Sequence, residues 1–302
     1  MSVGERKKGR AVAALLLGAV AIGFGPIFVR LSEAGPSATA FWRLALAFPA
    51  LWLWAKWEPS PKGGAPAGQQ RWIFLAGFFF AGDLALWHWS IQLTSVANAT
   101  LFANFAVIFV VAFSRLFQGE VIAPRFYLAL LIALGGTVLL VGGNVRLGTQ
   151  TLLGDALGIG AALFYAGYLL TVKRLRASYS TARIMTGSAA VSAPLLAIVA
   201  VASRETLLPV SNSGWLMVLA LALLSHAAGQ SLIAFALAHV RTSFSSLALL
   251  LQPVVAGFAA WVLLAEQLMA WQLAGGFAVL CGVALARPRE QETEVTDARE
   301  AG

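Results

Sequence analysis

Residues 97–120, ANATLFANFAVIFVVAFSRLFQGE, and residues 243–266, SFSSLALLLQPVVAGFAAWVLLAE, follow one pattern. Each stretch opens with small polar residues, continues through aliphatic and aromatic residues, and ends on a glutamate. The two glutamates, Glu120 and Glu266, are 146 residues apart, and the same offset relates Gly136 to Gly282 in the segments that follow. The sequence therefore contains an internal repeat of nearly half its length.

The chain around these stretches is apolar enough to cross a membrane many times. Of its 302 residues 59% are hydrophobic and 11% charged, and the mean hydropathy is +0.80. A soluble domain carries about 25% charged residues. A helix needs about 20 apolar residues to span the hydrocarbon core. Segments of that kind lie at residues 11–31, 37–57, 72–93, 97–117, 124–143, 152–172, 181–202, 214–238, 243–264 and 268–286.

These segments predict an all-α membrane protein with ten transmembrane helices, because the alternating strands of a membrane β-barrel do not occur. The offset of 146 residues divides the helices into two units, residues 11–143 and 152–286. Five spans is an odd number, so the second unit must be inverted relative to the first. Inverted repeats are typical of transporters that expose a site between the repeats to each side in turn.

The distribution of positive charge predicts the orientation. Lys and Arg gather at alternate span ends, as in Lys7 and Lys8, Lys173 and Arg174, and Arg287. By the positive-inside rule, residues 1–10 and 287–302 are cytoplasmic tails. The same placement argues against nucleic-acid binding, despite a net charge of +8.

The first apolar segment follows basic residues, as a signal peptide does, but it continues to about residue 31 and is interpreted as a retained helix. The polar residues 290–302 are expected to be disordered. The lone Cys281 excludes a disulfide within the chain and a cysteine-based metal site. Neither metal-ligand spacing nor a glycine-rich phosphate loop is present, so we expect no metal and no cofactor. Nothing in the sequence fixes an oligomeric state.

Four prolines, Pro26, Pro49, Pro194 and Pro253, lie inside predicted spans. Proline removes a backbone donor and bends a helix. Pro49 and Pro194 occupy nearly equivalent places in the two units. The bends are either static or allow the helices to flex during gating.

Four ionisable residues, Arg43, Asp83, His88 and His226, lie well inside spans. A charge at mid-membrane costs about 2.5–3.5 kcal/mol on insertion scales, so such groups normally face a cavity or a partner. Asp83 shares a helix face with Trp87, whereas His88 points elsewhere. Asp83 belongs either to a substrate site or to a hydrogen bond or ion pair between helices. His88 and His226 belong either to a substrate site or to the packing between helices. Arg43 either reaches the interface or provides a counter-charge for a substrate or for Asp83.

Further polar residues come from several spans and predict one central cavity. Helical spacing pairs Thr100 with Asn104 and His226 with Gln230, while Tyr165 and Tyr168 are close on the sixth span. Singly such residues join helices. As a set they are our candidate substrate-binding residues: Arg43, Asp83, Trp87, His88, Thr100, Asn104, Tyr165, Tyr168, His226, Gln230 and Gln252.

The chain resembles the EamA-type branch of the drug/metabolite transporter superfamily over residues 11–286. The resemblance rests on these segments: Pro36-Ser-Ala-Thr-Ala-Phe-Trp-Arg43, Leu93-Thr-Ser-Val-Ala-Asn-Ala-Thr100, Gly119-Glu120, Ala265-Glu266, Gly135-Gly136 and Cys281-Gly282. It implies an inner-membrane carrier of small metabolites, often an exporter of amino acids or related compounds. Val107 stands where the second half has Pro253, so we expect the fourth helix to lack the kink of the ninth.

The leading hypothesis is a secondary transporter of a small polar or amphipathic metabolite such as an amino acid. Transport could be coupled to protons through Asp83, or it could be passive facilitation or exchange. An intramembrane enzyme is one alternative, but the order and facing of Asp83 and His88 do not suit catalysis, and Ser188 and Ser225 lack a nucleophile motif. A channel is the other, although no selectivity loop or ring of charges is evident. The expected partners are therefore the bilayer and a small molecule.

Overall fold

In the computed structural model, the residues described are 3–58, 68–94, 96–142, 148, 151–264 and 269–287. The predicted tail at 290–302 and Glu266 lie outside this set. The helices in chain order are α1 (Val3–Gly23), α2 (Gly25–Arg30), α3 (Pro36–Ala45), α4 (Phe48–Trp57), α5 (Gln70–Leu93), α6 (Val96–Asn104), α7 (Ala106–Gln118), α8 (Pro124–Gly142), α9 (Leu152–Leu175), α10 (Thr181–Ala202), α11 (Asn212–Ala220), the π-helix η1 (Leu221–Gln230), α12 (Ser231–Ala236), α13 (Thr242–Ala248), α14 (Leu251–Leu264) and α15 (Ala270–Ala286).

Within the described ranges, nine helical stretches are long and apolar enough to cross a membrane, and α15 is a shorter apolar helix. The prediction of an all-α protein with ten membrane helices is confirmed. Five spans are built from consecutive segments, namely α1–α2, α3–α4, α6–α7, α11–η1–α12 and α13–α14, whereas α5, α8, α9, α10 and α15 each form a span alone.

Proline accounts for three of these interruptions. Pro26 and Pro49 stand in the first turns of α2 and α4, and Pro253 stands in the first turn of α14. Their missing N–H groups and their rings disfavour continuation of the preceding helix. Pro194 differs, because α10 continues through it without interruption.

The fourth span is interrupted at Phe105, between α6 and α7, although it contains no proline. The expectation that Val107 in place of proline leaves this helix unbroken is wrong. The Asn104 side-chain amide donates to the Thr100 carbonyl at 2.7 Å, and the Phe105 N–H donates to Phe102 at 3.1 Å. The Asn104 side chain thus competes with backbone N–H groups for the Thr100 carbonyl. Such competition can interrupt a helix without a proline.

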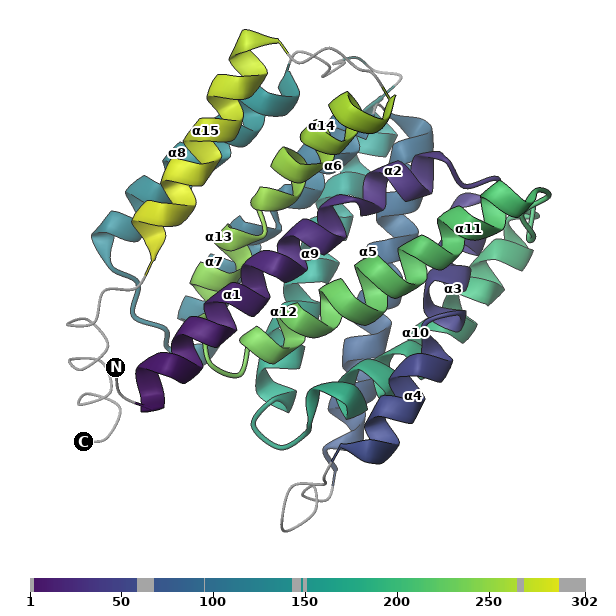
Figure 1. Ribbon diagram of the computed structural model, residues 1–302, viewed down its shortest axis with the longest axis horizontal. Coiled ribbons are helices and arrows are strands. Elements are labelled where there is room, and N and C mark those ends of the chain that lie inside the picture. The colour runs from purple at the N-terminus through teal and green to yellow at the C-terminus, as the bar shows by residue number, and fades with distance from the viewer. Residues whose placement is uncertain are drawn as a thin grey trace.

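The two halves of the chain make reciprocal contacts between α8 and α15, which lie side by side in Figure 1. A Cβ at Gly136 would lie 2.7 Å from the carbonyl oxygen of Gly275, and a Cβ at Gly282 would lie 2.7 Å from that of Ala129. Gly275 and Ala129 are themselves 146 residues apart. Each helix therefore places an equivalent glycine against an equivalent point of the other, as a two-fold axis between inverted repeats requires.

Two glutamates repeat this symmetry at the helix ends. The Ala182 N–H of α10 donates to Glu58 at 3.0 Å, and the Ala38 N–H of α3 donates to Glu205 at 2.9 Å. Glu58 follows the second span and Glu205 the seventh, so each of two equivalent spans caps the first turn of the other. A carboxylate there satisfies an otherwise unpaired amide and interacts favourably with the helix dipole.

The first residues of α1 and the last of α15 lie toward the same end of the bundle (Figure 1). We call this the basic end, because it also holds Lys173, Arg174 and Arg241. At the opposite end, the Val210 and Ser211 amides donate to Glu33 at 2.9 and 2.8 Å. The Ser211 hydroxyl and then these amides hold the pKa of Glu33 below its ordinary value.

Candidate functional site

A cavity lies between the two halves of the chain, and both contribute to its lining. The first half contributes residues of α1, α2, α3, α5, α6 and α7, and the second half contributes residues of α9, η1, α13 and α14. Its volume is about 90 Å³, below the roughly 300–1,000 Å³ of typical small-molecule sites. We call it the central cavity.

Eight of the eleven candidate residues line the central cavity: Arg43, Asp83, Trp87, Thr100, Asn104, Tyr165, Gln230 and Gln252. The structure brings them together from spans far apart in the sequence. His88, Tyr168 and His226 are absent from the lining and lie buried in the surrounding packing.

Arg43 is almost completely buried, with 4% of its surface exposed. Of the two alternatives left open by the sequence, it faces the interior instead of reaching the interface. Its guanidinium lies 5.9 Å from the centre of the Phe80 ring. The described lining of the central cavity contains one basic side chain, Arg43, and one acidic side chain, Asp83, in surroundings that are otherwise mainly apolar.

Unsatisfied hydrogen-bond donors point to what this cavity can bind. The Nε of Arg43 and the Nε2 atoms of Gln230 and Gln252 are buried and have no hydrogen-bond partner among the residues that the structure describes. All three side chains line the central cavity. Burying an unpaired donor costs about 1–3 kcal/mol, which an acceptor brought by a ligand would recover.

Local helix geometry positions these groups. Gln230 is the last residue of the π-helix η1, and π-helical turns recur at functional sites. Gln252 stands beside the proline-linked break at the start of α14. Thr100 and Asn104 come from the disturbed end of α6, where the Asn104 amide is held by the Thr100 carbonyl.

Phe80 is a lining residue that the candidate set did not include. It lies three residues before Asp83 and seven before Trp87, so with Leu84 it completes one face of α5. The helical spacing from Asp83 was a usable signal. The residue type itself gave no signal, because phenylalanine is common in apolar spans whether or not a cavity is near.

The three candidates outside the lining pack around aromatic rings of the cavity wall. Tyr168 and His226 stack on Phe80, with ring centres 4.6 and 5.3 Å away, and His88 contacts Trp87 edge to face at 5.1 Å. The Tyr168 hydroxyl donates to the Met185 sulfur at 3.6 Å. These side chains hold Phe80 and Trp87 in place.

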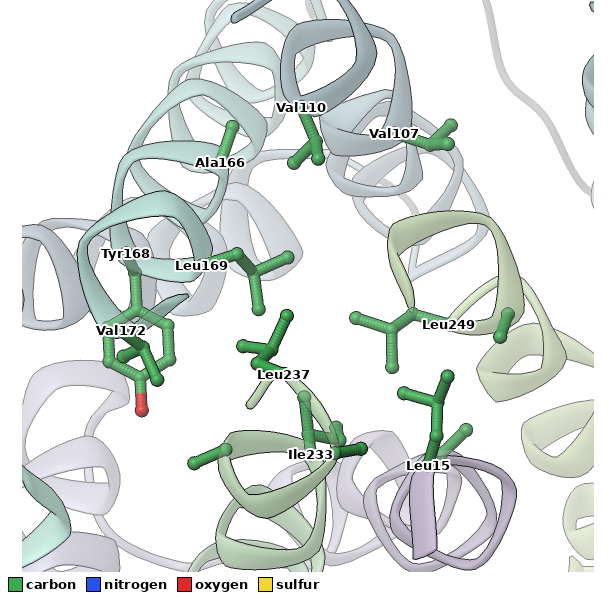
Figure 2. Close-up of a cluster of buried hydrophobic side chains, with 14 of the residues drawn as sticks. Leu15, Val107, Val110, Ala166, Tyr168, Leu169, Val172, Ile233, Leu237 and Leu249 are labelled. Atoms are coloured by element: carbon green, nitrogen blue, oxygen red, sulfur yellow. The ribbon is translucent and has the colours of Figure 1, made fainter. Parts of the chain in front are cut away.

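An apolar layer borders the central cavity on the side of the basic end. Figure 2 shows Leu169, Leu237 and Leu249 pointing toward one another from three different parts of the fold. Leu15, Val110 and Ile233 are buried beside them. Leu169 and Leu249 also line the central cavity, so the layer begins directly at its wall.

Polar contacts between the halves accompany this layer at the basic end. The Ser243 hydroxyl and its N–H, the latter at 3.4 Å, both donate to Glu120, and the Thr242 hydroxyl donates to Gln118 at 3.2 Å. Glu120 thus joins the end of the fourth span to the first turn of the ninth. We call these contacts the basic-end latch.

The opposite end is also joined across the halves. The Asn98 amide and the Thr94 hydroxyl donate to Asp155, at 2.7 and 2.8 Å. Asp155 is buried in the first turn of α9, where its charge is favoured by the helix dipole. Contacts therefore hold the two halves together at both ends, and the cavity between the halves is small.

Ten membrane helices, a two-fold relation between their halves and a cavity between those halves define a membrane transporter of the inverted-repeat class. A model of the EamA-like transporter family matches residues 9–142 and again residues 152–287. The chain belongs to this family, and the prediction of two five-helix repeats is confirmed.

Two proteins of Archaeoglobus fulgidus, each named an uncharacterized transporter, are similar to this chain. One is 28% identical over 279 residues, covering 91% of this chain and 95% of the relative. The other is 28% identical over 160 residues, so the match spans only about half of either protein, 51% of this chain and 54% of the relative. A crystal structure shares the fold with a TM-score of 0.76 at 17% identity, covering 94% of this chain and 96% of that one.

Proposed function

We propose that this EamA-family protein is a secondary transporter of the inner membrane that exports small metabolites with an apolar body and a polar head, such as amino acids. One observation carries the proposal: the central cavity combines buried unpaired donors at Arg43, Gln230 and Gln252 with the carboxylate of Asp83. A substrate carboxylate complements the donors, and a substrate ammonium complements Asp83.

The remaining lining explains the apolar part of the substrate. Phe80, Trp87 and Leu169 provide aromatic and aliphatic surface beside the polar groups. An apolar cavity with a few placed polar groups is the usual form of a small-molecule site. Arg43 is the only Lys or Arg among the described residues that line this cavity, which is too little for a phosphorylated metabolite.

The transport cycle we propose is alternating access by rocking of one five-helix unit against the other. Opening the basic end requires separation of the apolar layer and of the basic-end latch. Opening the other end requires separation of Asp155 from Asn98 and Thr94. In the proposed cycle, the closed stage between the two open ones has both sets of contacts formed, as they are in this structure. In this cycle both termini lie in the cytoplasm.

A thermal-shift screen tests the substrate class. Purified protein in detergent is heated with each common amino acid, and with sugar phosphates and nucleotides for comparison. A ligand that binds only the folded state at a hundred times its Kd stabilises it by about 2.7 kcal/mol, a clear rise in melting temperature. We expect that rise for one or more amino acids, and its loss in Arg43→Gln. Stabilisation by phosphorylated compounds alone would contradict the proposal.

A further inference from the structure

A second and larger cavity, of about 990 Å³, lies at the basic end. Five helices, α1, α5, α7, α9 and α13, line both this cavity and the central one. Along α9, Tyr165 and Leu169 face the central cavity, whereas Leu170 and Thr171 face the second. The second cavity, which we call the basic vestibule, thus shares helices with the central cavity, and in the proposed transport cycle it continues the same passage toward the basic end.

The vestibule wall is strongly cationic. Lys8, Lys173, Arg174 and Arg241 line it, and Glu120 provides the single carboxylate among the described lining residues. That carboxylate accepts hydrogen bonds from Ser243 as part of the basic-end latch.

Contacts on the wall hold three of the cations in place. The Lys173 ammonium donates to the Val240 carbonyl at 3.1 Å, and the Arg241 guanidinium donates to the Val121 carbonyl at 3.3 Å. The Arg174 guanidinium lies 4.3 Å from the ring centre of Trp72. Positions fixed in this way reduce the entropy lost when an anion binds.

His239 lies on the same wall, and its pKa responds to burial and to the positive charges around it. Burial, and then the positive charges of Arg176, Lys173 and Lys7, lower the pKa of this imidazole. The positive charge of the vestibule comes from its lysines and arginines.

Orientation of the chain in the membrane explains why cations gather at this end, but not why four of them line a cavity. Arg115 and Arg183 belong to the same end and do not line the vestibule. Arg115 is exposed and donates to the Tyr127 hydroxyl at 2.9 Å. These two arginines serve orientation without facing the passage, which makes them matched controls.

We propose that the basic vestibule is a second binding site, separate from the central cavity, for carboxylate-bearing metabolites at the cytoplasmic mouth of the passage. Its role as a mouth rests on the proposed transport function. A cavity lined by one sign of charge between low-dielectric walls concentrates ions of the opposite sign. The vestibule therefore favours anionic cargo over neutral cargo, and neutral over cationic cargo, before selection in the central cavity.

Citrate, a small polyvalent carboxylate, is the probe that tests the site. Its binding to the purified full-length protein is measured by calorimetry in neutral detergent at constant ionic strength. We expect saturable binding that the double substitution Lys173→Gln with Arg241→Gln weakens about fivefold to tenfold, because it removes two charge-assisted contacts. Arg115→Gln with Arg183→Gln, which removes the same charge from the same end, should leave the binding unchanged.

Equal weakening by both double substitutions would overturn the proposal, since it would show only a dependence on net charge. Arg174→Gln, at an exposed position, replaces the first pair if that pair does not fold. Displacement of citrate by phosphatidylglycerol but not by phosphatidylcholine would assign the vestibule to lipid headgroups and would also overturn it. Citrate binding needs no transport, so failure of the transport proposal and failure of this site are distinguishable.

Discussion

Asp83 and Arg43 are the residues on which the proposed chemistry depends most. Both line the central cavity, so a substrate that brings its own ammonium and carboxylate can interact with both side chains.

Neutralising Asp83 should impair transport more than folding. Asp83→Asn keeps the shape of the side chain but removes its charge and its ability to take up a proton. We expect transport to fall by tenfold or more, because a charge-assisted contact is worth about 1.5–3 kcal/mol, while the melting temperature changes little. Transport at the wild-type rate across a range of pH would show that Asp83 has only a structural role.

At this scale the sequence predicted much of the polar lining and its gathering around one cavity, but not which candidates lie outside that lining. Buried charge is costly, so residue type and position within a span were enough to single out Arg43 and Asp83. His88 and His226 stood out for the same reason, yet they pack against aromatic rings outside the cavity lining. Facing depends on the packing of neighbouring helices, which residue type alone does not encode.

Among the helices, the α8–α15 contact depends on the absence of a side chain at Gly136. A Cβ there would lie 2.7 Å from a backbone oxygen of α15, whereas a Cβ at the adjacent Gly135 would meet nothing within 4 Å. Gly136→Ala should therefore cost about 1–3 kcal/mol by overpacking. Gly135→Ala should be neutral or slightly stabilising, because alanine favours the helix. Melting temperatures in detergent test the pair, and equal effects would refute the contact.

The basic-end latch offers a second prediction for the helices. Glu120→Gln removes the charge that caps α13, and losing a cap costs about 1 kcal/mol, or roughly fivefold in an equilibrium. The apolar layer should then open more often. Leu169→Cys in a Cys281→Ser background provides a thiol in that layer. It should react about fivefold faster with a membrane-impermeant thiol reagent applied from the basic end when Glu120→Gln is also present.

Glu58→Gln is the control for the latch, because Glu58 caps α10 at the same end but takes no part in the contacts around Glu120. It should leave the labelling rate unchanged. A rate that does not respond to Glu120→Gln, or that responds equally to Glu58→Gln, would remove the latch from the gating mechanism.

The sequence predicted where helices lie better than where they break. Proline indicated the interruptions at Pro26, Pro49 and Pro253, but Pro194 lies in a continuous helix. The break at Phe105 involves a side-chain hydrogen bond from Asn104, which no pattern of residue types singles out. The position of a helix follows from the apolar length of its own segment. A break in a helix depends on which donor, backbone or side chain, each backbone carbonyl binds.

For the whole molecule, an inverted repeat fixes which loops share a side of the membrane. A reporter fused after Gly302 should be cytoplasmic, and one inserted between Asn144 and Thr151, in the connection between the two repeats, should be external. An alkaline phosphatase and a fluorescent protein at each position measure this directly. Signals from the same side at both positions would contradict the arrangement of five spans per repeat.

The central claim, alternating access around a cavity for amphipathic metabolites, is tested most directly by counterflow in proteoliposomes. Vesicles loaded with a mixture of unlabelled amino acids are diluted into a trace of the labelled mixture. We expect transient, saturable accumulation of label that neutral amino acids inhibit and that Asp83→Asn abolishes. Uptake without overshoot or saturation would indicate a channel, and strong inhibition by sugar phosphates or nucleotides with none by neutral amino acids would contradict the proposed cavity.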